Sequence, residues 1–291
     1  MNHWIIYAEI LLLVGLARTA NGQSDSIFQT KEIYKTVDSL QLEIHVFQSN
    51  KTLERNKNTA IIFFHGGGWT SGSPMEFFDV CRRYANMGVV AFSACYRLSV
   101  SHGKVPHREV SPIESLMDAK SAVRWVRENA ARFGIDENKV VAAGQSAGGH
   151  LAISTAMIDA YNDSADDPEM DCRPDAVLLF SACLNTVMEW CDYLLGDRRH
   201  LIWSISPAHH IREDLPPMIQ FHGKDDGKVE FWTVRFFKDE MEKKGNTFEL
   251  HALEGRKHYL GDGTNKYANY FDDEILEIAD DFLRKHHFTE D

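Results

Sequence analysis

The sequence predicts an α/β fold: a mostly parallel sheet of about eight strands, with an antiparallel hairpin at its N-terminal end and helices on both faces. Two observations lead to this fold class. The first apolar segment alternates with a period of two, as a strand with one solvent-exposed face does. The later apolar segments are short continuous runs separated by helical stretches, as in a parallel sheet covered on both sides.

Residues 31–48 are the predicted hairpin. Apolar side chains recur at every second position from Leu40 to Val46, so they share one face of a strand. Asp38-Ser39 stands directly before this run, where a tight turn is expected. The segment therefore forms the antiparallel start of the sheet.

Six later runs have the length and composition of buried strands, and helical patterns alternate with them. Residues 115–132 carry apolar side chains on a 3.6-residue period, and Gly134 follows where a C-cap belongs. A last helix is expected over about 273–286. Together with the hairpin, the runs make an open, doubly wound sheet. The predicted buried strands are 60–64, 89–94, 140–143, 176–180, 218–221 and 248–253.

The N-terminus predicts export. An apolar stretch, interrupted by Glu9, ends in small residues, and Ala20 and Gly22 suit a signal-peptidase site, so residues 1–22 read as a signal peptide. An ordinary buried helix is the alternative. The stretch falls short of the ~20 apolar residues of a spanning helix, so no stable membrane anchor is expected. We therefore expect a secreted or periplasmic protein with a single folded domain over residues 23–291.

Charge and cysteine content exclude some classes of function. A net charge of −12 over 291 residues argues against a nucleic-acid-binding surface. The cysteines form neither a CxxC nor a Cys/His pattern, so we expect no metal site. An oxidising compartment would permit a bridge among the last three, but buried free thiols suit the sequence equally well. The five cysteines are Cys81, Cys95, Cys172, Cys183 and Cys191.

The strongest local motif is Gly144-Gln145-Ser146-Ala147-Gly148, which joins the predicted strand at 140–143 to a helical segment. A nucleophilic hydroxyl that stands clear of a sheet needs a tight strand-to-helix turn, and flanking glycines leave room for that backbone. The helix that begins there directs its positive end toward a developing oxyanion. Ser146 is therefore the candidate nucleophile.

A second motif, His65-Gly66-Gly67-Gly68-Trp69, follows the predicted strand at 60–64. Three glycines in a row can form a plain flexible loop. They can also leave backbone N–H groups uncovered, so that these groups bind an oxyanion, and this pattern accompanies GxSxG in lipases and esterases. The two motifs stand in the expected order, each at a strand end, which favours the second interpretation.

These motifs resemble those of the α/β-hydrolases, in the hormone-sensitive-lipase-like and acetyl-esterase-like branch of the carboxylesterases. The resemblance covers nearly all of residues 25–288. It implies the α/β-hydrolase fold and a triad in the order Ser, Asp, His. It also implies an oxyanion hole formed by the N–H groups of Gly67, Gly68 and Ala147. The matching segments are HGGGW, Tyr96-Arg97-Leu98, DAKSAVRWVRENAARFGID, GQSAGGH and FHGKDDGKV.

The resemblance also indicates the acid and the base. HGKDDGKV, at 222–229, matches an H-G-x-x-D-x-x-V pattern on Asp226, and Asp225 is the alternative acid. The base is expected in the loop after the strand at 248–253, which selects His258. His251 lies inside that strand and not in the loop after it. His209-His210 precedes the acid and is out of order, so a structural or surface role is expected there.

Two departures from the family pattern affect the pocket. Cys95 stands where relatives often carry Asp, so local hydrogen bonding there is expected to differ. The chain also lacks the long N-terminal extension that forms a cap in many relatives, so residues 184–211 are a possible lid insertion. Its apolar side chains either line a pocket or seal the edge of the sheet. They are Met188, Trp190, Tyr193, Leu194, Leu195, Leu201, Ile202 and Trp203.

The expected activity is that of a serine carboxylesterase that needs neither cofactor nor metal. The resemblance implies short-acyl esters, small or attached to plant polysaccharide, cleaved through an acyl-enzyme. A prolyl-oligopeptidase-like serine peptidase is one alternative, although no domain of propeller size is present. A non-catalytic binding module is another, although such proteins usually lose part of the triad. The sequence leaves the oligomeric state open.

Overall fold

The computed structural model describes residues 26–101, 105–106, 109–187, 189–261 and 272–290. Its main sheet has eight strands in the order β1-β2-β4-β3-β7-β8-β9-β10, and β1–β2 and β2–β4 pair antiparallel while the other neighbours pair parallel. This arrangement confirms the predicted fold class. The strands are β1 (Ile27–Val37), β2 (Leu40–Ser49), β3 (Asn58–Phe64), β4 (Val90–Ala94), β7 (Ile135–Gln145), β8 (Ala176–Phe180), β9 (Met218–Gly223) and β10 (Phe248–Leu253).

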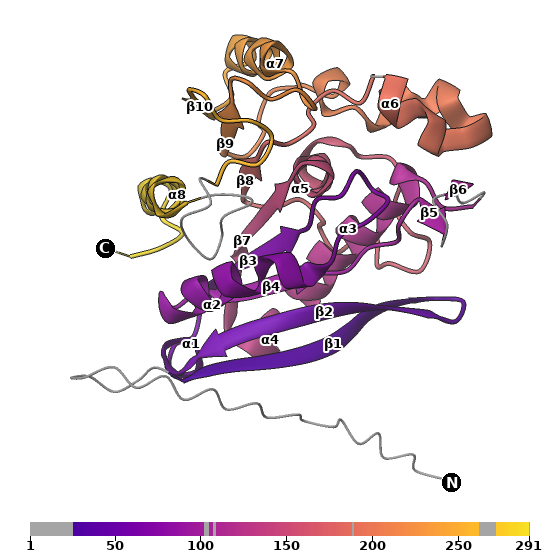
Figure 1. The fold of residues 1–291 in the computed structure, drawn as a ribbon. Coiled ribbons are helices and arrows are strands. Elements are labelled where there is room, and N and C mark those ends of the chain that lie inside the picture. Colours follow the sequence, from indigo (N-terminus) through magenta and orange to yellow (C-terminus); the bar gives the residue numbers. More distant parts are fainter. Residues whose placement is uncertain (1–25, 102–104, 107–108, 188, 262–271, 291) are drawn as a thin grey trace, which may run out of the picture.

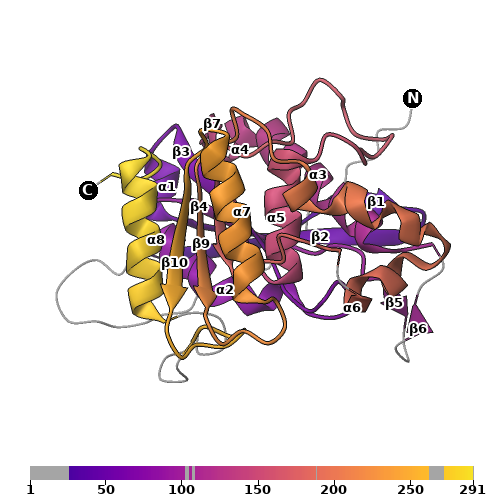
Figure 2. The same cartoon turned by 90° about the horizontal axis from the view of Figure 1, so that it is seen from above.

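Helices cover both faces of the sheet. Figure 1 shows α2 and α8 on one side of it and α3 and α5 on the other. Seen from above, α7 and α8 lie on opposite sides of β9 and β10 (Figure 2). The helices are α1 (Asn50–Glu54), α2 (Phe78–Asn86), α3 (Pro112–Glu128), α4 (Ala130–Phe133), α5 (Ala147–Met157), α6 (Glu189–Asp192), α7 (Phe231–Lys243) and α8 (Asp273–Lys285), with 3₁₀ segments η1 (Pro74–Phe77), η2 (Tyr193–Ile205) and η3 (Pro207–His209).

Two apolar layers hold the sheet, one on each face. In β3, Ile62 and Phe64 pack into the layer under α3, α5 and α7, whereas Ile61 and Phe63 pack into the layer under α2 and α8. Because alternate side chains of a strand point to opposite faces, a strand buried on both sides must be apolar at every position. The continuous runs in the sequence therefore mark strands of the sheet interior, except the run at 248–253, because β10 forms an edge of the sheet and is only partly buried.

Turn and capping residues in the sequence begin and end the observed elements. The β1–β2 hairpin turns at Asp38-Ser39, and Val37 pairs with Leu40 across it. Ser111 caps α3 by accepting from the N–H of Ile113, with Pro112 at the first helical position. The predicted helix over 115–132 divides at Asn129 into α3 and α4, and Gly134, with a φ of 65°, ends α4 in the left-handed conformation.

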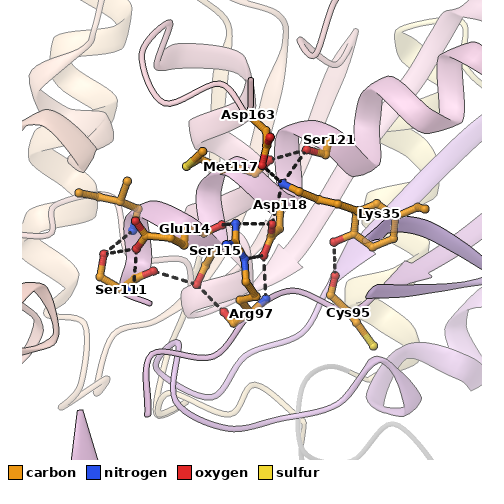
Figure 3. Close-up of polar contacts among 12 residues, drawn as sticks. Lys35, Cys95, Arg97, Ser111, Glu114, Ser115, Met117, Asp118, Ser121 and Asp163 are labelled. Atoms are coloured by element: carbon orange, nitrogen blue, oxygen red, sulfur yellow. Dashed lines mark hydrogen bonds and ion pairs between the residues drawn. The ribbon is translucent and has the colours of Figure 1, made fainter. Parts of the chain in front are cut away.

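A buried ionic cluster ties the hairpin to the rest of the molecule. The Asp118 carboxylate of α3 binds Lys35 Nζ of β1 at 2.8 Å and Arg97 Nε at 2.8 Å, and the side chain of Asp118 is completely buried. Arg97 also donates its backbone N–H to Asp118 Oδ2 at 2.9 Å. Lys35 reaches Asp163 at 2.7 Å as well (Figure 3). The segment after β4, where Cys95 departs from the family pattern, is thus fixed through Arg97.

The structure bears on the cysteines, on possible metal sites and on possible membrane-spanning helices. All five cysteines are free thiols, and all but Cys95 are buried. In the described ranges, no set of three His, Cys, Asp or Glu side chains is arranged to hold a metal ion. No helix among the described residues is long and apolar enough to cross a membrane. The predicted signal peptide, residues 1–22, lies outside the described residues.

Residues 184–211 pack mainly as part of the core. Leu194, Leu195 and Ile202 are buried beside α3 and α5, whereas Tyr193 and Trp203 are 43% and 54% exposed. Arg198 binds Glu114 of α3 at 2.7 Å, which anchors the segment. The side chains of 188 and 190 lie outside the described part. The packing of the described side chains favours a seal over the sheet.

Candidate active site

The candidate residues come from the carboxyl ends of four parallel strands. Ser146 directly follows β7, Asp226 lies three residues beyond β9, His258 lies five residues beyond β10, and the glycine loop follows β3. Because parallel strands end at the same edge of a sheet, these loops gather in one place. The fold therefore brings together residues that are far apart in the sequence.

Ser146 occupies a strained turn. Its φ of 55° and ψ of −118° are unusual for a non-glycine residue, and the first turn of α5 follows directly. The close packing around this turn requires Gly148, since a Cβ there would come within 2.0 Å of the carbonyl oxygen of Phe64. Glycine at this position lets α5 approach the end of β3, so the nucleophile turn and the glycine loop are neighbours.

The three candidate triad residues form one hydrogen-bonded chain. His258 Nε2 lies 2.9 Å from Ser146 Oγ, and His258 Nδ1 lies 2.8 Å from Asp226 Oδ2. The three residues are almost fully buried, with Ser146, Asp226 and His258 at 7%, 6% and 6% exposure. This geometry allows His258 to accept a proton from the serine while the carboxylate holds the other ring nitrogen.

The acid is well defined by its contacts. Asp226 Oδ1 accepts from the backbone N–H groups of Lys228 and Val229 at 2.8 and 3.0 Å. Burial alone would raise the pKa of Asp226, but hydrogen bonds from His222 and His258 outweigh it and hold the pKa well below its ordinary value. Asp225, the alternative acid, is exposed and takes no part in the hydrogen bonds that join Asp226, His258 and Ser146.

The glycine loop is held in conformations that suit glycine. Gly67 and Gly68 have φ values of 110° and 61°, and both line the same cavity as Ser146. Ala147 is fully buried as the first residue of α5. Among hydrogen bonds between described residues, none uses the N–H of Gly67, Gly68 or Ala147. The oxyanion role expected for them from the family resemblance requires such N–H donors.

Tyr96 holds the start of the glycine loop. Its hydroxyl donates to the carbonyl oxygen of His65 at 2.8 Å, and its ring stacks on His65 with centroids 4.3 Å apart. Burial lowers the pKa of His65 to about 4 and that of His150 to about 4. The histidine that contacts the serine is His258, with Nε2 at 2.9 Å from Ser146 Oγ.

A cavity of about 480 Å³ opens at Ser146. Its described walls come from the glycine loop, the loop after Asp226 and Tyr259, which is half exposed. No described residue of 184–211 lines it. The ammonium group of Lys228 lies 4.9 Å from the centre of the Tyr259 ring at the rim. The lining residues are Gly67, Gly68, Ser71, Gln145, Ser146, Gly227, Lys228, Val229, His258 and Tyr259.

Two residues that contact the His258 and Asp226 side chains were not identified from the sequence. Gln145 Nε2 lies 3.4 Å from His258 Nε2, and His222 Nε2 lies 3.2 Å from Asp226 Oδ2. Both residues lie inside motifs identified in the sequence. A glutamine or histidine there indicates no contact with the triad until the direction of its side chain is known. His251 instead stacks on Phe221, with ring centroids 5.3 Å apart, away from the hydrogen-bonded chain.

His209 and His210 also lie outside the hydrogen-bonded chain. His209 contacts Trp203 edge-on at 4.5 Å between ring centroids. His210 Nε2 lies 3.0 Å from the carbonyl oxygen of Ser204. Both histidines therefore contact the segment that covers α3 and α5.

Comparison with known proteins agrees with this fold. Esterase 2 of Thermogutta terrifontis in its apo form superposes with a TM-score of 0.80 and 37% identity, covering 90% of this chain and 96% of that one. Esterase LipC of Mycobacterium tuberculosis is 26% identical over 201 residues, which are 62% of this chain and 47% of LipC. The match to endo-1,4-beta-xylanase B of Butyrivibrio fibrisolvens, 24% identical over 216 residues, spans 70% of this chain and 33% of the xylanase.

The chain thus spans about half, or less, of these curated relatives. A family model, BD-FAE, matches residues 47–241, which is more than half of the chain and includes the glycine loop, Ser146 and Asp226. This match confirms the α/β-hydrolase resemblance at the level of the family. The chain belongs to the BD-FAE family.

Proposed function

We propose that the protein is a serine hydrolase of carboxylic esters, with Ser146 as nucleophile, His258 as general base and Asp226 as the acid. One observation carries the proposal: the hydrogen-bonded chain from Asp226 through His258 to Ser146, with spacings of 2.8 and 2.9 Å, opens on a cavity. Esterases among the relatives, and a related esterase captured phosphorylated by paraoxon, support it.

The reaction proceeds in two halves. Ser146 Oγ attacks the ester carbonyl as its proton moves to His258 Nε2, and the negative charge that develops on the carbonyl oxygen is held by the N–H groups of Gly67, Gly68 and Ala147. The intermediate collapses, and the leaving alcohol takes the proton from His258. Water then attacks the acyl-enzyme, again with His258 as base, and the carboxylic acid departs. Asp226 keeps the imidazole in the required tautomer.

The substrates we propose carry short acyl groups. The cavity of about 480 Å³ is modest, and no described residue of 184–211 extends its walls. The related Thermogutta esterase 2 has been solved with propionate and with butyrate bound, at TM-scores of 0.81 and 0.79. The xylanase relative supports esters attached to plant polysaccharide as natural substrates.

A chain-length series tests the proposal. We expect kcat/KM to be highest for p-nitrophenyl acetate or butyrate and lower for dodecanoate, because each added CH₂ gains up to about 0.8 kcal/mol only while it meets a buried wall. Ser146→Ala should abolish turnover of all these esters and should also prevent labelling by a fluorophosphonate. Rates that keep rising to dodecanoate would reject the short-acyl assignment, and an active Ser146→Ala variant would reject the nucleophile. Release of acetate from acetylated xylan tests the polysaccharide assignment.

Fluorophosphonate labelling, together with a comparison of prolyl peptides and esters as substrates, separates the alternative functions. A peptidase of the prolyl-oligopeptidase type would label with the fluorophosphonate but would cleave prolyl peptides faster than esters. A non-catalytic binding module would not label at all.

We also propose that residues 1–22 direct export, and N-terminal sequencing of the protein recovered outside the cytoplasm should begin at Gln23. A protein that keeps Met1 and stays inside the cell would reject this.

A further inference from the structure

We propose that His222 is a positioning residue for the acid: it holds the Asp226 carboxylate toward His258 and shares the negative charge of that carboxylate. The inference rests on the proposed function, in which Asp226 partners the general base. His222 touches neither the serine nor the cavity, so it acts only through Asp226.

His222 is built into a rigid element. It lies in β9 between β8 and β10, and its side chain is completely buried. Its Nε2 lies 3.2 Å from Asp226 Oδ2 and 2.9 Å from the carbonyl oxygen of Val229. Both neighbours are acceptors, so Nε2 carries the proton and donates to them. One N–H group thus contacts two residues of the turn after β9, Asp226 and Val229.

The other ring nitrogen is fixed as well. Gln220, also completely buried in β9, places its Nε2 2.9 Å from His222 Nδ1 and 3.4 Å from the carbonyl oxygen of Ala182. An amide N–H that serves both contacts leaves Nδ1 as the acceptor nitrogen of the ring. The opposite amide orientation would set an oxygen against the Ala182 carbonyl oxygen, so the contacts select the Nε2–H tautomer.

The two oxygens of Asp226 are held differently. Two backbone N–H groups fix Oδ1, at 2.8 and 3.0 Å. Oδ2 is held by the side chains of His258, at 2.8 Å, and His222, at 3.2 Å. His258 must shift its own charge during the reaction, so His222 is the side chain that keeps Oδ2 in place throughout. Among the described residues, Asp226 is the titratable side chain within hydrogen-bond distance of His222, and the centroid of the Phe231 ring lies 6.2 Å from that of the His222 ring.

Loss of this donor has two consequences. Oδ2 gains freedom to move, which misaligns the imidazole and lowers kcat. It also keeps more negative charge facing His258 Nδ1–H, which favours the imidazolium form, so the acidic limb of the pH profile of kcat/KM moves to higher pH. A residue that merely filled space in β9 would change stability and leave that limb where it was.

The test compares His222→Leu, His222→Gln and His222→Asn with wild type on p-nitrophenyl acetate. We expect His222→Leu to lower kcat about 10- to 100-fold, as loss of a charge-assisted hydrogen bond does, with KM changed by less than about twofold. The amide nitrogen of Gln can occupy the Nε2 position, so His222→Gln should restore most of kcat and the position of the limb. The shorter Asn cannot reach Oδ2 and should resemble Leu.

Two controls make the outcome decisive. His251→Leu removes a histidine from the neighbouring strand β10 and should leave kcat and the pH limb unchanged. Ser146→Ala tests the proposed function itself: if wild type is active and Ser146→Ala is not, the function holds whatever happens at His222. Folding of each variant is checked by urea unfolding. If His222→Leu does not fold, the Gln and Asn pair decides. Equal kcat and equal limbs in that pair, or a folded Leu variant within about twofold of wild type, overturn the inference.

Discussion

At the scale of single residues, the site separates two adjacent carboxylates by their surroundings. Asp226 is buried and accepts from two backbone N–H groups and two imidazoles. Asp225 is exposed, and its backbone N–H binds the carbonyl oxygen of Arg256 at 3.0 Å. Sequence alone could not choose between them with certainty, because the direction of a side chain in a turn depends on the whole loop.

We predict that Asp226→Asn lowers kcat about 10⁴-fold, because the amide favours the wrong imidazole tautomer. Asp225→Asn, the matched change one residue away, should leave kcat within about twofold, as an exposed side chain outside the chain of hydrogen bonds does. Steady-state kinetics on p-nitrophenyl acetate measures both. Should Asp225→Asn be the damaging change, the acid has been misassigned.

At the scale of elements, the glycine loop depends on a neighbour from the end of β4. We predict that Tyr96→Phe lowers kcat about tenfold and stability by about 1 kcal/mol, because the hydroxyl that holds the His65 carbonyl is lost. Tyr34→Phe is the control. It removes a hydroxyl that donates to the Cys95 carbonyl at 2.6 Å, so it should cost similar stability but leave kcat unchanged. Equal kcat losses in the two variants would show that the tether has no specific role.

The predicted elements show where sequence reasoning succeeds. The strand at 176–180 agrees with β8, which is buried at every position, because a continuous apolar run requires burial on both faces. The strand at 248–253 agrees with β10 in its bounds, but β10 lies at the edge of the sheet and is only partly buried. The hairpin agrees because alternation fixes one buried face. The small sheet of β5 (Val100–Ser101) and β6 (Val105–Pro106) was not predicted, since two-residue strands leave no periodicity. The two possible roles of 184–211 also could not be separated, because apolar side chains suit a core and a pocket equally.

At the scale of the whole molecule, the Asp118 cluster joins the hairpin, the segment after β4 and α3 (Figure 3). We predict that Asp118→Asn destabilises the protein by about 3–5 kcal/mol, because Lys35 and Arg97 lose a buried counter-charge. Glu32→Gln, which breaks an exposed pair with Arg132, should cost at most about 1 kcal/mol. Urea unfolding measures both. Similar losses for the two variants would mean that burial adds nothing to the ion pair.

The last prediction concerns Lys120, a completely buried lysine of α3 whose ammonium group donates to the carbonyl oxygen of Ala160. Burial lowers the pKa of Lys120 from its ordinary value near 10.5 to about 8. Below pH 8 the folded and unfolded chains both hold this proton. Between about pH 8 and 10.5 only the unfolded chain holds it, so this group makes the free energy of unfolding rise with pH, by at most about 3 kcal/mol.

Lys120→Met removes both the buried charge and its titration. We expect the variant to be more stable than wild type at pH 7, because Ala160 is exposed and its carbonyl can bind water instead. The advantage should shrink by up to about 3 kcal/mol between pH 8 and 10.5, as wild-type Lys120 loses its proton. Other groups titrate in this range, so the measurement is the difference between the two proteins in urea unfolding at each pH. Lys244→Met, at an exposed site, should differ little from wild type at every pH. A difference between Lys120→Met and wild type that stays constant from pH 7 to 10.5 would show that folding leaves the titration of Lys120 unchanged.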